Sequence, residues 1–134
     1  MTVLQLGLLG WFAGVVAYVA SLALLYGQGL SRGDAPAVLF SSLAAFAICY
    51  WVLYLPVLRL VRRWLGARTS GWVFVLVAGL IGIVPTSLIA RFYGGSWHAL
   101  ATPEAGQFFI LFATVGIVIG LGFPFVYPPD TRGP

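Results

Sequence analysis

Four long segments of this sequence are apolar and uncharged, and any fold of the chain has to accommodate them. They cover residues 3–27, 36–58, 72–90 and 105–127, and none contains Asp, Glu, His, Lys or Arg. A helix of about 20 apolar residues crosses the roughly 30 Å hydrocarbon core of a bilayer. Hydrophobic residues make up 61% of the chain and charged residues 7%, whereas soluble domains average about 45–50% and about 25%. We therefore predict an all-α integral membrane protein, with four transmembrane helices in two helical hairpins forming one domain over residues 1–134.

The basic residues are concentrated between the second and third segments. Arg59, Arg62, Arg63 and Arg68 are four of the seven in the chain, and the sequence contains no lysine. Arginines beside apolar spans are retained on the cytoplasmic side during insertion, and with four spans both termini share that side. We predict a multi-pass protein of a bacterial inner membrane, with both termini and an arginine loop, residues 59–68, in the cytoplasm. The loop explains the net charge of +4, so we expect it to meet anionic lipid and expect no nucleic acid partner.

Small residues recur at helical spacing on three of the segments. Residues three or four positions apart share one helix face, and small side chains let membrane helices approach closely. We predict that these faces are packing surfaces, either within the chain or against a partner subunit. Their members are Gly7, Gly10, Gly14, Ala17 and Ser21 in the first segment, Gly79 and Gly82 in the third, and Gly116 and Gly120 in the fourth.

Prolines indicate where the helices start, bend and end. Asp34 and Thr102 stand just ahead of prolines, a pattern typical of helix starts. Pro56 lies in the last turn of the second segment, where a kink costs less than at mid-helix. Pro85 predicts a bend in the third segment, where the hydroxyls of the next two residues are available to bond the carbonyl that proline leaves free.

The segments offer little for chemistry inside a membrane. Proton- and ion-coupled transporters place an ionisable group near the bilayer midplane, and these spans have none. The single cysteine, Cys49, and the single histidine, His98, do not make the coordination shell of a metal or haem. We therefore predict no catalytic residue, no metal and no cofactor, and we favour a function without enzymatic activity.

The ionisable side chains of the other two loops form the remaining candidate polar site. One interpretation is a loop clamp that also caps helices. A sharper one is a head-group or anion site built on Arg32 and Arg91. The full set is Arg32, Asp34, Arg91, His98 and Glu104.

Three functions are compatible with this pattern. The first, which we favour, is a non-catalytic subunit, or an accessory or assembly component, of a larger membrane complex, in contact with lipids and with other membrane-protein subunits. The second is a small transporter or channel that works as a homo-oligomer without an intramembrane ionisable residue, its path lined by backbone and by hydroxyls such as those of Thr86 and Ser87. The third is an enzyme acting on lipid at the outer rim, and it has the weakest basis.

Overall fold

The computed structural model describes residues 1–66, 70–94 and 97–128 of the chain. All regular structure in these ranges is helical, and no strand occurs there. In chain order the elements are α1 (Val3–Tyr26), α2 (Asp34–Cys49), the π-helical turn η1 (Tyr50–Tyr54), α3 (Leu55–Leu65), α4 (Gly71–Ile81), α5 (Ile83–Gly94), the 3-10 turn η2 (Trp97–Ala101) and α6 (Pro103–Val126).

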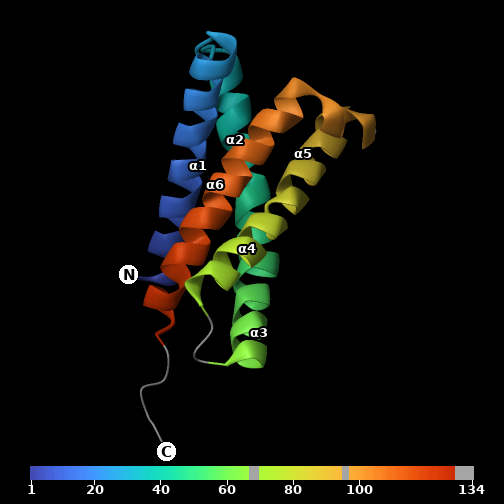
Figure 1. Cartoon of the computed structure of the whole chain (residues 1–134). Helices are drawn as coiled ribbons and strands as arrows, with labels where there is room; N and C mark the ends of the chain where they lie inside the picture. Colours follow the sequence, from blue (N-terminus) through green and yellow to red (C-terminus); the bar gives the residue numbers. More distant parts are fainter. Residues whose placement is uncertain (67–69, 95–96, 129–134) are drawn as a thin grey trace, which may run out of the picture.

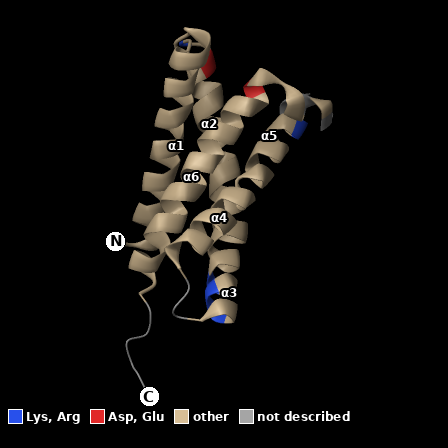
Figure 2. Ribbon diagram, in the orientation of Figure 1, with Lys and Arg blue, Asp and Glu red and all other residues tan. Residues whose placement is uncertain are grey.

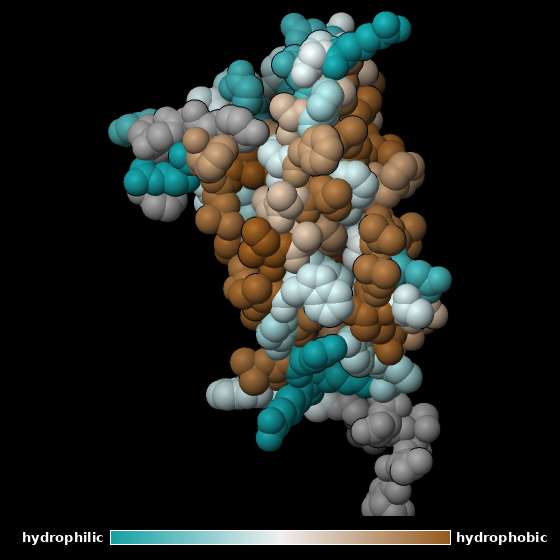
Figure 3. Space-filling view, turned by 180° about the vertical axis from the view of Figure 1, so that it is seen from behind, coloured by the Kyte–Doolittle hydropathy of each residue, from teal (hydrophilic) through white to brown (hydrophobic). Residues whose placement is uncertain are grey.

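Four helical runs are long and apolar enough to cross a membrane, which confirms the prediction of an all-α chain with four such helices. They are Val3–Tyr26, Asp34–Leu65, Gly71–Phe92 and Pro103–Val126. The 24 residues of α1 span about 36 Å at roughly 1.5 Å per residue. Hydrophobic side chains cover the middle of the molecule, and hydrophilic ones gather towards its two ends (Figure 3).

The charged residues of the bundle gather at its two ends. One end holds the N-terminus, the end of α6 and the last turns of α3 with their arginines, and we call it the arginine end (Figures 1 and 2). The other holds the connections from α1 to α2 and from α5 to α6, with Arg32 and Arg91, and the acidic residues of the described part of the chain lie there (Figure 2). These are Asp34, the first residue of α2, and Glu104 in the first turn of α6. We call it the carboxylate end.

Helix α6 lies between α1 and α4 (Figure 1) and makes its most extensive contacts with these two helices. The glycine face of α1 packs on α6. A Cβ at Gly14 would lie 2.7 Å from the carbonyl oxygen of Leu111, and one at Gly10 would lie 3.0 Å from the Ile119 side chain. Because α1 contacts α6 far more than α2, the packing joins the two halves of the chain.

A second face of α6 packs on α4 through its own glycines. A Cβ at Gly116 would lie 2.6 Å from the carbonyl oxygen of Ala78, and one at Gly120 would lie 2.5 Å from the Val75 Cα. Small residues in these positions let the two backbones touch. A Cβ at Gly79 would meet nothing within 4 Å. The backbone of Gly79 takes part in this contact, but a side chain at that position would not disturb it.

The second membrane-crossing run is longer than predicted, and placing its end at residue 58 was wrong. It continues to Leu65, so Arg59, Arg62 and Arg63 lie in helix α3 and not in a loop. The helix passes Pro56 because η1 widens the preceding turn, with the Leu55 N–H bonded to the Tyr50 carbonyl. Buried Leu58 continues the core face beyond it. Arg68 lies outside the described residues.

The third run bends at Gly82, between α4 and α5, three residues before Pro85. The hydroxyls of the next two residues bond backbone carbonyls: Thr86 Oγ1 donates to Gly82 O at 3.2 Å and Ser87 Oγ to Ile83 O at 2.8 Å. Neither bonds the carbonyl of Ile81, four residues before Pro85, which is the one that the proline leaves free. Thr102 caps α6 by accepting from the Ala105 N–H at 3.3 Å.

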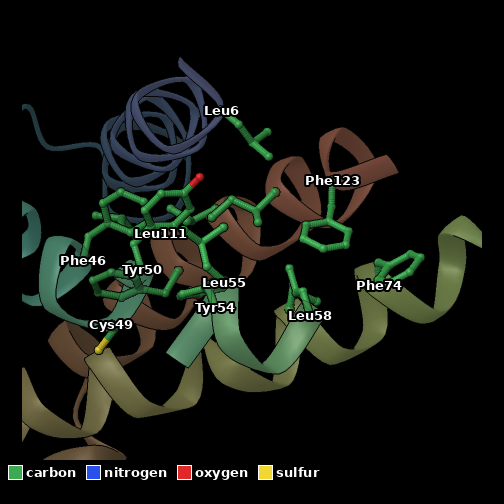
Figure 4. Packing of buried hydrophobic residues seen from close by; sticks show 14 of the residues in the cluster. Leu6, Phe46, Cys49, Tyr50, Tyr54, Leu55, Leu58, Phe74, Leu111 and Phe123 are labelled. Atoms are coloured by element: carbon green, nitrogen blue, oxygen red, sulfur yellow. The ribbon is translucent and has the colours of Figure 1, made fainter. Parts of the chain in front are cut away.

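The buried core fills the part of the bundle nearer the arginine end. Phe46, Tyr50 and Tyr54 project from the second run and pack with Leu111 of α6 (Figure 4). Their ring centroids lie 5.2 to 6.5 Å apart. Phe74 of α4 stacks on Phe123 of α6 at 5.0 Å. These rings are 0 to 4% exposed, so they form a tightly packed aromatic core in this part of the bundle.

Candidate functional site

A cavity of about 480 Å³ opens at the carboxylate end, between α1, α2, α5 and α6. Apolar side chains form most of its wall, including Leu22, Val38 and Phe108. Its polar groups are few and come from separate parts of the chain. Among them are Tyr18, Ser41, Asp34 and Glu104. A concave apolar pocket of this size with a few convergent polar groups is the usual form of a small-molecule site.

Asp34 and Glu104 stand at the rim of this cavity, each at the start of a helix. The Asp34 carboxylate accepts from the Ser31 hydroxyl at 2.6 Å, and the same hydroxyl accepts from the Asp34 N–H at 3.0 Å. Ser31 therefore caps α2, the role that we predicted for Asp34. Within the described part of the chain, the Glu104 carboxylate has no hydrogen-bond or ion-pair partner.

Tyr18 of α1 contributes a polar group to the wall of the cavity. It is only 7% exposed and packs against Phe108 of α6, with ring centroids 5.4 Å apart. Its hydroxyl has no hydrogen bond within the described residues, and the charges of Asp34 and Glu104 both act on it. Sequence reasoning missed Tyr18, although it follows Gly14 by four positions and thus lies on the glycine face of α1.

A groove of about 590 Å³ lies along the outside of α2 and α5, next to the cavity. Ala37, Ser41 and Ile89 line both spaces. Ala44 and Ala45 of α2 continue the groove, opposite Leu88 and Phe92 of α5. It contains almost no polar surface, since Ser41 donates its hydroxyl to the Ala37 carbonyl of its own helix at 2.6 Å. The cavity thus has an apolar groove on its outer side, between α2 and α5.

The structure separates the other predicted rim residues from the cavity. Arg32 lines a different groove, of about 500 Å³, beside Trp11 and Leu43. Arg91, at the end of α5, and His98, in η2, are exposed and are not among the described residues that line the cavity. The described residues therefore bring together the two acids and leave the arginines of the predicted anion site apart.

At the arginine end, one of the predicted lipid-facing arginines is held against the protein. The Arg59 guanidinium lies over the Tyr127 ring, 4.9 Å from its centroid, and donates to the Tyr127 hydroxyl. Arg62 is half-buried and Arg63 is exposed. This contact joins α3 to the segment that follows α6.

The remaining predicted packing residues of α1 line its contact with the rest of the bundle. Gly7 faces the ring of Tyr50, whose hydroxyl donates to the Val3 carbonyl at 2.6 Å. Ser21 is buried and donates to the Tyr18 carbonyl at 2.8 Å, whereas Ala17 is half-buried. Gly82, between α4 and α5, is in close contact with α6, because a Cβ there would lie 2.8 Å from the Phe112 carbonyl oxygen.

Two buried groups in the second run have no evident task in the cavity. Tyr54 is 0% exposed, and its hydroxyl has no hydrogen-bond partner among the described residues. Cys49 is a buried free thiol. The described residues contain no group of three or more His, Cys, Asp or Glu side chains that could hold a metal ion. Comparison of the chain with protein-family models, with curated proteins and with solved structures found no match.

Proposed function

We propose that this chain is a non-catalytic accessory component of a larger membrane complex, and that it acts by binding a ligand in the cavity at the carboxylate end. The observation that supports this is that the cavity lies next to an apolar groove on the outside of the bundle, and that Ala37, Ser41 and Ile89 line both. Such a site admits a molecule from the membrane. Its polar groups are two carboxylates, hydroxyls and an amide, and they suit recognition better than bond making.

We further propose a single domain in a bacterial inner membrane, with the arginine end in the cytoplasm. Arg59, Arg62 and Arg63 lie at the same end as the N-terminus and the end of α6 (Figures 1 and 2). Arginines flanking membrane spans favour the cytoplasmic side and attract anionic lipid. The predicted role of Arg68 follows the same reasoning from the sequence. The carboxylate end then faces outwards.

A protein partner would have to use surfaces other than the glycine faces. Gly10 and Gly14 are in contact with α6, and Gly116 and Gly120 with α4. These residues support packing within the chain. The case for a complex therefore rests on the absence of a catalytic constellation among the described residues and on the laterally open site, not on a free helix-packing stripe.

The alternative, a homo-oligomeric transporter or channel, has less support. Thr86 and Ser87 were its support, but Thr86 is 0% exposed and both hydroxyls bond backbone carbonyls of their own helical run. The packed aromatic core around Phe46 and Tyr50 fills the part of the bundle nearer the arginine end. A path through one chain would require that core to open.

The test is affinity purification from the native membrane in a mild detergent, with identification of both co-purified proteins and co-purified lipids. A stoichiometric unlike subunit together with an enriched amphiphile supports the proposal. A pure homo-oligomer supports the transporter instead. Ser41→Leu, which fills the passage between groove and cavity, should remove the amphiphile. Ala20→Leu, the same kind of enlargement on an exposed face of α1, is the matched control and should retain it.

A further inference from the structure

We propose that the cavity at the carboxylate end binds an amphiphile that carries an ammonium group and an apolar chain. This inference rests on the proposed function, because it assumes that the cavity is a ligand site. It adds the chemical class of the ligand. The ammonium group is placed at Asp34 and Glu104, and the chain in the groove between α2 and α5.

The charge of the rim selects a cation. Asp34 and Glu104 bring two negative charges to one opening. The N-termini of α2 and α6 lie beside them, and each is equivalent to about half a positive charge. These dipoles offset about one of the two negative charges. Arg32 and Arg91 lie at the same end of the bundle but are not among the described residues that line the cavity. The groups that line the opening therefore leave about one negative charge for a ligand to neutralise.

Tyr18 is an independent sign of a ligand in the same cavity. Its hydroxyl is not one of the fully buried atoms without a hydrogen bond, since among the described residues only the Tyr54 hydroxyl is, and it is therefore accessible from the cavity. The Tyr18 side chain is 7% exposed, lines the cavity and has no partner for its hydroxyl among the described residues. An ammonium group can donate to this oxygen, and an ester carbonyl below the ammonium can accept from it.

The lateral groove accounts for the apolar chain. Small side chains at Ala37, Ala44 and Ala45 leave space against α5. A chain lying there stays in contact with the bilayer while its polar end reaches the cavity past Ser41. The cavity beside the groove is bounded by four helices and does not admit a partner helix, whose diameter with side chains is about 10–12 Å.

Selectivity must come from the charged end of the ligand. Moving an acyl chain from lipid tails into an apolar groove gains little, because both surroundings are equally apolar. A charge-assisted hydrogen bond to one of the two exposed carboxylates contributes more, and an anionic head group would meet like charge. The site should therefore distinguish amphiphiles of equal chain length by charge.

The test uses the full chain in dodecyl maltoside and native mass spectrometry with three matched probes at pH 7: dodecylamine, which is protonated, dodecanol and dodecyl sulfate. The wild type should retain one dodecylammonium in preference to the other two. Asp34→Asn with Glu104→Gln should weaken this retention about tenfold or more, which is the loss expected for a charge-assisted contact. Tyr18→Phe should weaken it less. Unchanged unfolding temperatures show that each variant is folded, and Glu104→Gln alone replaces the double variant if that one fails to fold.

The outcomes separate this inference from the proposed function. If Ser41→Leu abolishes retention but the amide variants bind dodecylammonium as the wild type does, the cavity is a ligand site and the ammonium assignment is wrong. If none of the variants changes retention, the probe associates with the micelle only, and both proposals fail. Native preparations could instead carry a basic transmembrane peptide that is lost in the Asp34→Asn and Glu104→Gln variants. In that case the occupant is a protein, and the proposal of an amphiphile is wrong.

Discussion

Gly116 of α6 rests on the backbone of Ala78 of α4, so closely that a Cβ at position 116 would lie 2.6 Å from the Ala78 carbonyl oxygen. A side chain cannot occupy that space unless one helix moves. The contact is backbone on backbone, because Gly79 Cα also lies 2.8 Å from the same position. The separation of α4 and α6 is thus set by the absence of a single methyl group.

Gly116→Ala should therefore destabilise the protein by about 1–3 kcal/mol, the usual cost of overpacking. Thermal unfolding in detergent is the measurement. Gly106→Ala, in the same helix, is the matched control, because a Cβ there meets nothing within 4 Å. That change should raise stability by about 0.5–1 kcal/mol, since alanine loses less backbone entropy in a helix. Equal effects of the two changes would show that α4 and α6 are not in this contact.

Gly14→Ile should lower the stability of the isolated chain, because Leu111 and Val115 of α6 occupy the space that the side chain needs. Leu9→Ile is the control, since Leu9 is 54% exposed on the same helix. The two variants are compared by unfolding temperature and by size-exclusion profile. A stable Gly14→Ile chain that had lost a co-purified subunit would assign the glycine face of α1 to a partner.

Tyr54→Phe should stabilise the protein by about 1 kcal/mol, because it removes a buried hydroxyl that has no partner among the described residues. Tyr50→Phe removes the same atom from the neighbouring ring, where the hydroxyl donates to the Val3 carbonyl. It should cost about 0.5–1.5 kcal/mol. Denaturation of both variants in one detergent gives the comparison. A larger loss for Tyr54→Phe would reveal an undetected partner for that hydroxyl.

Arg59→Gln should loosen the link between α3 and the end of α6, at a cost of about 0.5–2 kcal/mol for the lost cation–π contact with Tyr127. Arg63→Gln, which changes an exposed arginine of the same helix, should have almost no effect. A double-mutant cycle with Tyr127→Leu isolates the pair. Independent effects of Arg59→Gln and Tyr127→Leu would argue against the contact.

Reporter fusions test the proposed orientation. A cytoplasmic reporter inserted at Gly66 or fused after Pro134 should be active, because arginines retain the adjoining segments on that side. A reporter that works only outside the membrane should be active at Gly29, in the connection from α1 to α2. An external signal at Gly66 would reverse the orientation and place Asp34 and Glu104 in the cytoplasm.

The membrane-crossing helices could be predicted from the sequence because hydropathy and length depend only on local residues. The partner of each helix could not. The spacing of Gly10 and Gly14 predicts a close contact but fits any helix, and the structure sets these residues against Leu111, Val115 and Ile119, not against a second glycine stripe. The end of the second run was misplaced because the π turn before Pro56 rests on the Tyr50 carbonyl bond, which leaves no mark in composition.

The cavity illustrates the same limit. Asp34 and Glu104 were both recognised as rim residues, but their positions far apart in the sequence did not indicate that they share an opening without Arg32 or Arg91. That follows from how α2 and α6 pack. Tyr18 was overlooked because an aromatic residue in a membrane span usually meets lipid or core, and its unpartnered hydroxyl becomes evident only when the surrounding helices are in place.

The turn at Tyr50–Tyr54 determines in which direction around the helix axis the side chains of α3 point. Each residue of an α-helix advances by about 100° around the axis, and a π turn holds one residue more than the α-helical turn it replaces. The residues of α3 are therefore rotated by about a quarter of a circle relative to an uninterrupted continuation of α2. Deleting one residue of the turn, for example exposed Trp51, would leave length and hydropathy nearly unchanged. It would also rotate Leu58 out of the core and carry Arg59 away from Tyr127.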